Sequence, residues 1–560
     1  MLVGIDLGTT HSLVGHFTAD GPRLIPNALG ELLTPSCVSM DDGGRVLVGR
    51  AARERLVTHA ECTAAAFKRA MGSDREIVLG KQRFRPEELS ALVLRALLDD
   101  ARNALGSDIT EAVISVPAYF SDAQRKATKA AGELAGIKVE RLINEPTAAA
   151  LAYGLESRAD GSTFMVLDLG GGTFDVSILE IFDGVMQVHA SAGDNFLGGE
   201  DFLEVLVKHA CSELKLDPAR LSRAEQAHIG ARMERAKIAL SGSQPVAVEF
   251  NLGGTTPRIE IDEPRFEALA QPLLKRLRLP IERALRDAKL GPEDLSELIL
   301  VGGASRMPMV ARLATRMFGR LPLRHVHPDQ AIALGACVAA GMKARRQELS
   351  EVVMTDVCPY TLGVDTARED ERGQAHSGFF SPIIERNCTV PVSRAQTYTP
   401  VRDYQTVLHF GIYQGESPRV QNNIKLGELE LKLEKLPAAE NATEIRFTYD
   451  VNGLLQVEAR VLRTGETKEV ILNRSEHALS EGEIRQRLAA LARLKIHPRE
   501  DQANVALLAR AERVYAEYLQ YRDELTDWIA RFTQLLDTQD VDRIAAGRVE
   551  FEGTLDRIER

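Results

Sequence analysis

Two stretches of the chain place apolar, strand-like runs on either side of a short turn rich in glycine and threonine. Phe164–Asp168 and Val176–Ile181 flank the turn at 170–173, and residues 2–14 repeat the arrangement around Gly8, Thr9 and Thr10. This alternation predicts two strand–turn–strand hairpins. Because both contain the same Asp-Leu-Gly core, the chain is expected to fold into two similar lobes that offer one hairpin each to a shared cleft.

The turns have the chemistry of a phosphate site. Without Cβ atoms, Gly170, Gly171 and Gly172 allow backbone N–H groups to close on a phosphate, and Thr173 adds a hydroxyl. The flanking carboxylates of Asp168 and Asp175, and that of Asp6 in the first copy, suit a hydrated Mg²⁺. One copy alone would also fit an ordinary hairpin, but two copies favour a nucleotide site.

The remainder of the first 160 residues alternates helical and strand-like patterns. A helix is predicted over Ala51–Met71, an amphipathic helix over Pro86–Leu105, a strand over Ala112–Val116 and a helix over Ser121–Ala135. The first of these carries Lys68. It is either a solvated surface charge or, in a cleft, a point charge for phosphate oxygens.

Glu145 precedes a proline at the start of an alanine-rich helix. It is either a first-turn acid that favours the helix dipole or, if it faces the cleft, a group that orients water.

Residues 186–275 have the pattern of an inserted α/β lobe. Within it Glu234, Lys237 and Ser241 recur at helical spacing and share one face, which also fits an exposed charge pair. Further on, the strand at Glu297–Val301 runs into Gly302 and Gly303, which would permit close backbone approach to a ligand.

Beyond residue 349 the pattern changes. Residues 350–356 are short and apolar and are interpreted as an interdomain linker; 357–479 alternate as in a small β-sandwich, and 480–560 show only amphipathic helices. With residues 1–349 as a nucleotide-binding domain, the prediction is three domains, as a length of 560 residues allows.

Composition limits the function classes. The net charge of −11 argues against nucleic-acid and anionic-membrane binding, and no apolar run is long enough to span a bilayer. Six scattered cysteines without a C-x-x-C pair argue against a zinc site and a disulfide framework and fit a reducing, cytoplasmic location.

Several motifs together resemble one family. The segments IDLGTT from Ile5, VPAYF from Val116, NEPTAAALAYG from Asn144, DLGGGTFDV from Asp168 and VGGASR from Val301 occur in the order seen in seventy-kilodalton heat-shock chaperones of the DnaK type. The short length suggests the bacterial HscC branch. The resemblance covers nearly the whole chain. It implies an α/β, actin-like two-lobed ATPase domain, a β-sandwich peptide-binding domain and a short α-helical lid.

The resemblance also implies site residues. The phosphates would be held by Gly8, Thr9, Thr10, His11, Gly171, Gly172 and Thr173, and the adenosine by Glu234, Lys237, Ser241, Gly303 and Arg306, with Asp329 nearby. Asp6 and Asp168 would anchor Mg²⁺ through water, with potassium ions close by. Lys68 would position the γ-phosphate of ATP, and Glu145, Asp175 and Thr173 would arrange the attacking water. Pro117, Arg125 and Asp356 would relay the nucleotide state to the linker.

In such a chaperone ATP opens the lid and hydrolysis to ADP closes it on an extended hydrophobic segment of an unfolded protein. The matching peptide positions are Val364, Thr366, Ala367, Tyr398, Val401, Leu408 and Phe410. A J-domain co-chaperone is an implied partner, and the protein is expected to be a monomer. The segment 242–258 is shorter than in long members. We therefore expect little dependence on the usual exchange factor and faster spontaneous ADP release.

Three alternatives remain open at this stage. A small-molecule kinase and a filament-forming protein share the actin-like hairpins, but neither accounts for the 210 or so residues after the linker. A third is an ATPase whose C-terminal part has lost peptide binding and serves regulation. The third is kept open by the altered pocket, with Ala367, Val401 and the charged insertion 368–376. Separately, Thr355 in the linker weakens apolar docking and leaves the strength of coupling between the domains open.

Overall fold

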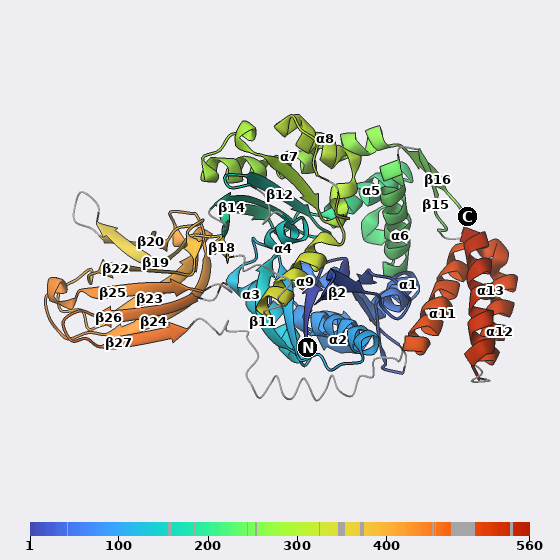
Figure 1. Cartoon of the computed structure of the whole chain (residues 1–560), viewed down its shortest axis with the longest axis horizontal. Helices are drawn as coiled ribbons and strands as arrows, with labels where there is room; N and C mark the ends of the chain where they lie inside the picture. Colours follow the sequence, from blue (N-terminus) through green and yellow to red (C-terminus); the bar gives the residue numbers. More distant parts are fainter. Residues whose placement is uncertain are drawn as a thin grey trace.

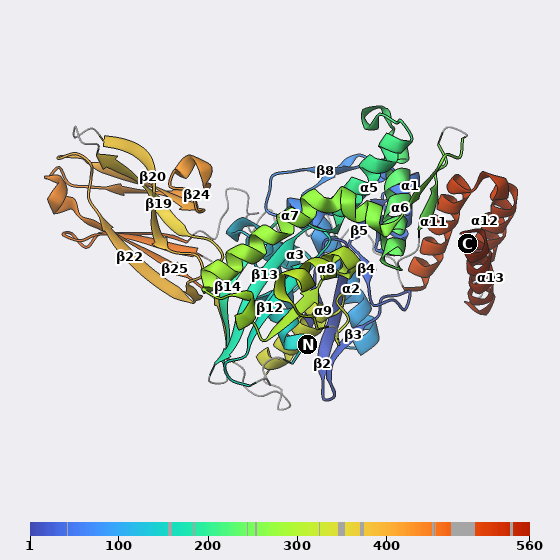
Figure 2. The same ribbon diagram turned by 90° about the horizontal axis from the view of Figure 1, so that it is seen from above.

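The structure is a computed structural model in which a two-lobed α/β body lies between a β-sandwich and a bundle of three helices (Figure 1). It describes residues 1–41, 43–154, 159–182, 185–242, 245–252, 255–323, 325–344, 353–369, 375–450, 453, 455–471, 499–537 and 541–559. Turning the view by 90° leaves the sandwich and the bundle at opposite ends of the α/β body (Figure 2).

A six-stranded sheet forms the centre of each lobe. The first has the order β11–β10–β1–β2–β3, with β4 beside β2; the second has the order β17–β12–β13–β14–β18–β21. The strands of the first sheet are β1 (Leu2–Asp6), β2 (His11–Thr18), β3 (Gly21–Ile25), β4 (Thr34–Pro35), β10 (Glu111–Val116) and β11 (Lys138–Asn144). Those of the second are β12 (Thr163–Leu169), β13 (Phe174–Phe182), β14 (Val185–Asp194), β17 (Glu297–Val301), β18 (Val353–Val357) and β21 (Thr389–Val390).

Both predicted hairpins are confirmed. In β1–β2, Asp6 lies opposite Leu13, and in β12–β13, Asp168 lies opposite Asp175. Each pair flanks its turn, so the two turns occupy equivalent places in the two sheets.

Helices and small sheets cover these two sheets. The helices are α1 (Arg50–Thr58), α2 (Pro86–Leu105), α3 (Asp122–Leu134), α4 (Glu145–Ala152), α5 (Gly199–Glu213), α6 (Arg223–Ala239), α7 (Glu263–Ala288), α8 (Pro308–Phe318) and α9 (Ala331–Lys343). The small sheets consist of β5 (Cys37–Met40), β6 (Val46–Val48) and β7 (Thr63–Ala65), of β8 (Ile77–Leu79) and β9 (Gln82–Phe84), and of β15 (Val246–Glu249) and β16 (Arg258–Ile261).

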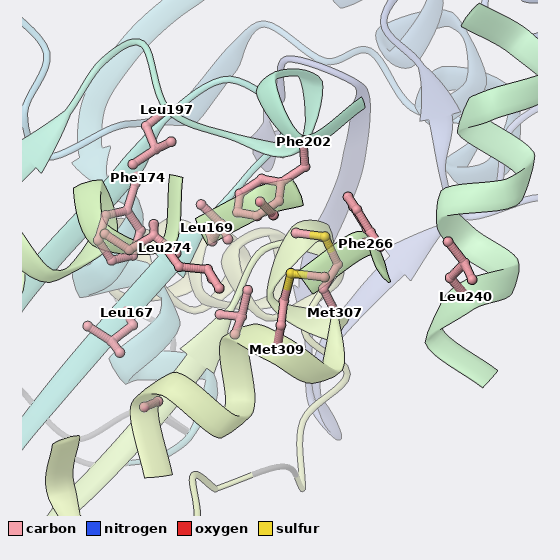
Figure 3. Close-up of a cluster of buried hydrophobic side chains, with 14 of the residues drawn as sticks. Leu167, Leu169, Phe174, Leu197, Phe202, Leu240, Phe266, Leu274, Met307 and Met309 are labelled. Carbon is pink, nitrogen blue, oxygen red and sulfur yellow. The ribbon is translucent and has the colours of Figure 1, made fainter. Parts of the chain in front are cut away.

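The core of the second lobe lies beneath the second hairpin. Figure 3 shows Leu169 and Phe174 at that hairpin converging with Phe202 of α5 and Phe266 of α7. The Phe202 and Phe266 rings meet edge to face, with their centroids 6.4 Å apart. Burial of each such side chain contributes roughly 1.5–3 kcal/mol, so the turn rests on a rigid base.

Two predictions of local structure were wrong. Ala51–Met71 is not one helix: α1 ends at Thr58, the chain forms β7 against β5, and Ala66 has a φ of 53°. The pairing of β7 with a distant strand overrides the helix propensity of its alanines. The inserted lobe does not begin at residue 186, because β14 is a full member of the second sheet; the insertion begins with α5.

The C-terminal half has the expected sandwich and helices. The sandwich sheets have the orders β20–β19–β23–β24 and β22–β25–β26–β27. Their strands are β19 (Leu362–Glu369), β20 (Ala375–Ile384), β22 (Val392–Tyr398), β23 (Val407–Gln414), β24 (Ile424–Lys432), β25 (Thr443–Tyr449), β26 (Leu455–Val461) and β27 (Thr467–Ile471). The bundle consists of α11 (Arg499–Glu517), α12 (Arg522–Asp537) and α13 (Val541–Glu559). The predicted lid start at 480, linker residues 350–352 and most of the insertion 368–376 lie outside the described residues. In the part of the chain that is described, no helix is long and apolar enough to cross a membrane.

The linker is joined to both of its neighbours. β18 pairs in parallel with β14, from Val185 opposite Val353 to Gln187 opposite Thr355, and then antiparallel with β21. The second lobe, the linker and the base of the sandwich therefore share one continuous sheet.

Candidate nucleotide site

The two hairpin turns face each other across a cavity of about 360 Å³ between the lobes. They approach so closely that a Cβ on Gly171 would lie 2.0 Å from Oγ1 of Thr10. Glycine is thus required at position 171, where the two turns meet.

The cavity brings together most of the residues predicted for the nucleotide. Its lining includes Asp6, Gly8, Thr9, Thr10, His11, Lys68, Glu145, Asp168, Gly171, Thr173, Glu234, Lys237, Ser241, Gly303, Arg306 and Asp329. Two predicted residues are outside this lining. Gly172 faces Arg69 and Thr9, and Asp175 lies in a second layer, where it accepts a hydrogen bond of 2.9 Å from the backbone N–H of Tyr119.

A buried ion pair crosses the floor of the cavity. Nζ of Lys68 lies 2.9 Å from Oε1 of Glu145, and the two side chains are 4% and 7% exposed. Lys68 is delivered by a short 3-10 turn, Phe67–Ala70, and Glu145 by the first residue of α4. A cation held this firmly beside the hairpins is positioned for phosphate oxygens.

Carboxylates surround this one cation. Burial, and then repulsion from Glu145, raise the pKa of both Asp6 and Asp175 to about 7. The pKa of Asp168 is raised as well, by burial and by its acidic neighbours. Asp6 accepts a hydrogen bond of 2.7 Å from Ser115.

These buried carboxylates would be stabilised by a further positive charge beside them. Both carboxylate oxygens of Asp168 are buried without a hydrogen-bond partner among the described residues. In the same part of the chain, no three His, Cys, Asp or Glu side chains converge as direct ligands of a metal. The arrangement therefore fits a magnesium ion that is bound through its water shell.

His11 lies at the end of the cavity that the two hairpin turns form. Nη1 of Arg53 in α1 donates to Nε2 of His11 at 3.0 Å. Burial and the guanidinium lower the pKa of His11 to about 4, so that the ring stays neutral and can accept this bond.

The opposite end of the cavity is formed by α6 and by the turn after β17. Lys237 donates to the backbone oxygen of Gly199 at 2.9 Å and lies 2.6 Å from Glu234. Arg306 pairs with Asp329 at 3.0 Å. This end of the cavity therefore offers several charged and polar groups to a ligand.

Several lining residues were missed from the sequence. Gly199 and Glu200 begin α5, and their backbone N–H groups donate to the oxygens of Gly170 and Gly171. Ile238, which lines the cavity although it is 62% exposed, follows Lys237 directly. The Gly198–Gly199 pair was a usable signal for the first two, whereas an exposed isoleucine in a polar helix carries none.

The predicted coupling residues form a chain of hydrogen bonds from the first lobe to the linker. Arg125 donates to Oδ1 of Asn144 at 2.7 Å and to the backbone oxygen of Ala118 at 3.0 Å, and Asn144 donates to Oδ2 of Asp356. Asn144 directly precedes Glu145 and was not singled out from the sequence. Pro117 is buried at the end of β10, where its backbone oxygen accepts from Phe120.

The predicted peptide residues lie in the sandwich. Val364, Leu408 and Phe410 are buried in its core, and the ring of Tyr398 lies 5.8 Å from that of Phe410, centroid to centroid. Thr366 and Ala367 are half-buried near the end of β19, and Val401 is 45% exposed in the loop after β22.

Comparison with known proteins agrees with this architecture. A profile described as "Hsp70 protein" matches residues 2–77 and 74–549. The chain is similar to the "Chaperone protein DnaK" of Thermotoga petrophila, with 39% identity over 525 residues that cover 91% of this chain and 86% of that protein. It is similar too to the "Chaperone protein DnaK" of Thermosipho africanus, with 40% identity over 86% of this chain and 81% of that protein. The paired phosphate hairpins, the sandwich and the helical bundle are thus those of a member of the Hsp70 family, to which this chain belongs.

Proposed function

We propose that this chain is an ATP-dependent molecular chaperone that binds and releases extended hydrophobic segments of unfolded proteins. One observation carries the proposal: strand β18 joins the sheet that bears the second phosphate hairpin to the base of the sandwich. A change at the phosphate site can therefore be transmitted through these paired strands to the base of the sandwich.

The cavity residues have separate roles in the binding and hydrolysis of ATP. Lys68 holds the γ-phosphate, and Asp6 and Asp168 bind the water shell of Mg²⁺, which neutralises phosphate charge when it is bound. Glu145, Thr173 and, from the second layer, Asp175 orient the attacking water. Glu234, Lys237, Ser241, Gly303 and Arg306 bind the adenosine, near Asp329. Potassium ions beside the phosphates belong to the same proposal.

The arrangement in Figure 1 corresponds in this proposal to the ATP-favoured state, because the linker is paired and the helical bundle lies far from the sandwich. Hydrolysis would release the linker and let the bundle return as a lid. ATP can drive this cycle only by binding the docked state more tightly than the undocked one.

Partners and location are part of the proposal. They comprise a J-domain co-chaperone, a monomeric state, a cytoplasmic location, no contact with nucleic acid or membrane, and little need for an exchange factor. Placement in the HscC branch and the domain limits also stay predictions.

The experiment is release of a labelled hydrophobic peptide, followed by fluorescence anisotropy before and after addition of ATP. We expect much faster release with ATP. Val401→Asp should weaken peptide binding, and the matched change at an exposed valine of the bundle, Val549→Asp, should not. Tight ATP binding with no peptide bound in any state would overturn the client-binding proposal and favour a regulatory sandwich.

A further inference from the structure

The helical bundle lies beside α1 and α6 (Figures 1 and 2), and its helix α11 packs against α1 of the first lobe and pairs with arginines of α6 in the second. Its contact with the first lobe is partly apolar. Ala506 is buried in a cluster with Ala51 and Ala52 of α1 and with Cys37 and Leu47 of the adjacent small sheet.

A buried arginine adds a polar contact with the first lobe. Nε of Arg513, whose side chain is 7% exposed, pairs with Glu54 of α1. Its other nitrogens bind within the bundle, at 2.9 Å from Glu517 and 2.5 Å from Glu559. The guanidinium therefore ties α1 to two helices of the bundle at once.

The contact with the second lobe lies at the C-terminal end of α11. Glu517, with a side-chain exposure of 1%, lies 3.5 Å from Arg235 and 3.8 Å from Arg232 of α6. Asn251 donates to the backbone oxygens of Ala516 and Glu517 at 3.3 and 3.1 Å. These carbonyls are among those that a helix end leaves unpaired, so the second lobe caps α11 and supplies cations to the negative end of its dipole.

Of the two helices of the α/β body that α11 contacts, α6 lines the nucleotide cavity, and α1 is linked to it through His11. The face of α6 that carries Glu234, Lys237 and Ile238 lines the cavity, while its neighbouring residues Arg232 and Arg235 meet α11. In α1, the residue next to Glu54 is Arg53, which donates to His11.

Without the bundle, α1 would still pack directly against α6, and few side-chain pairs would join the lobes beside that contact. Among described residues the side-chain pairs there are Arg69 with Asp201, at 3.1 Å, and Arg223 with Glu61, which is largely exposed. An exposed pair contributes little, about 1 kcal/mol or less. The Arg69–Asp201 pair is only partly buried, so the network of Arg513 and Glu517, whose side chains are 7% and 1% exposed, adds a buried restraint on separation of the lobes.

We propose that docked α11 is a clamp on the nucleotide cleft: it binds α1 and α6 together, so that the lobes cannot separate and bound nucleotide is retained until the bundle leaves. The clamp rests on the proposed function, because it assumes ATP in the cavity. It also reconciles retention of ATP with fast release of ADP, since the ADP state would lack the docked bundle.

The test uses the full chain loaded with a fluorescent ATP analogue and Mg²⁺, which is then displaced by excess unlabelled ATP. Glu517→Gln keeps the shape of the side chain but removes the charge shared by the three arginines. It should accelerate dissociation by about tenfold or more, the equivalent of one lost bond to a charged group. Glu512→Gln, at an exposed position of the same helix, should match the parent protein.

Hydrogen exchange in the same samples gives a second measure. The parent protein should protect amides of both α1 and α6 when ATP is bound, and Glu517→Gln should lose protection in α6. Equal dissociation rates for Glu517→Gln and Glu512→Gln, or protection of α1 without α6, would overturn the clamp. Failure of the parent protein to bind ATP would instead overturn the proposed function.

Discussion

Replacement of Asp356 by Asn tests whether the linker transmits the nucleotide state. Both carboxylate oxygens are used: Oδ2 accepts from Asn144, and Oδ1 accepts from its neighbour's backbone, Val357 N, at 2.8 Å. An amide offers only one acceptor oxygen, so in the docked state its NH₂ group must face another donor.

The expected change in the free energy of docking follows from these contacts. Loss of a hydrogen bond to a charged group costs roughly 1.5–3 kcal/mol. Burial raises the pKa of Asp356, which shows that its charge is itself costly in this site, and removal of that charge offsets part of the loss. We therefore take the lower end, about 1.5 kcal/mol, which corresponds to about a tenfold shift away from the docked state.

The assay is ATP-triggered release of a fluorescent peptide together with peptide stimulation of ATP hydrolysis. Asp356→Asn should slow the triggered release by up to about tenfold and weaken the stimulation. Affinity for ATP in the isolated binding step should change much less. Asp20→Asn, the same change at an exposed turn, is the control. If the two variants behave alike, the chain Arg125–Asn144–Asp356 does not couple the domains.

Two further predictions concern the cavity. Thr173→Ala should slow ATP hydrolysis by about a hundredfold, which is the typical cost of removing one positioned hydrogen-bond donor, and should leave nucleotide bound. Single-turnover kinetics would measure the rate beside that of the exposed control Thr110→Ala. A normal rate of hydrolysis in Thr173→Ala would mean that Thr173 is not part of the catalytic site. Lys68→Met leaves Glu145 buried and unpaired, so it should lower the free energy of unfolding of the nucleotide-binding part by about 3–5 kcal/mol and abolish hydrolysis, as denaturant unfolding would report. The exposed control Lys81→Met should do neither, and an unchanged unfolding midpoint in Lys68→Met would contradict the assigned ion pair.

How much of this structure can be predicted from the sequence depends on how far apart in the chain the interacting residues lie. The hairpins around Asp6 and Asp168 were predictable because alternation, glycine turns and flanking carboxylates are all local signals. The helix over Ala51–Met71 failed because β7 exists only through its pairing with β5, which no local pattern records.

The same division applies to the site. Lys68 and Glu145 could be proposed one at a time, but their ion pair joins segments that are distant in the chain. The contacts of α11 were not predictable at all: an amphipathic pattern indicates that a helix has a partner and does not say which one. Only the fold shows that Glu517 lies between Arg232 and Arg235.

The continuous sheet that runs from the second lobe through β18 to β21 also makes this protein a candidate for mechanical signalling. Tension on a bound client would pull β18 along the direction of β14, so that the three paired positions from Val353 to Thr355 would bear the load together instead of opening in turn. The neighbouring strand, β13, begins directly after Thr173. A client under tension would thus load a strand two places from Thr173, the residue that we propose helps to position the attacking water.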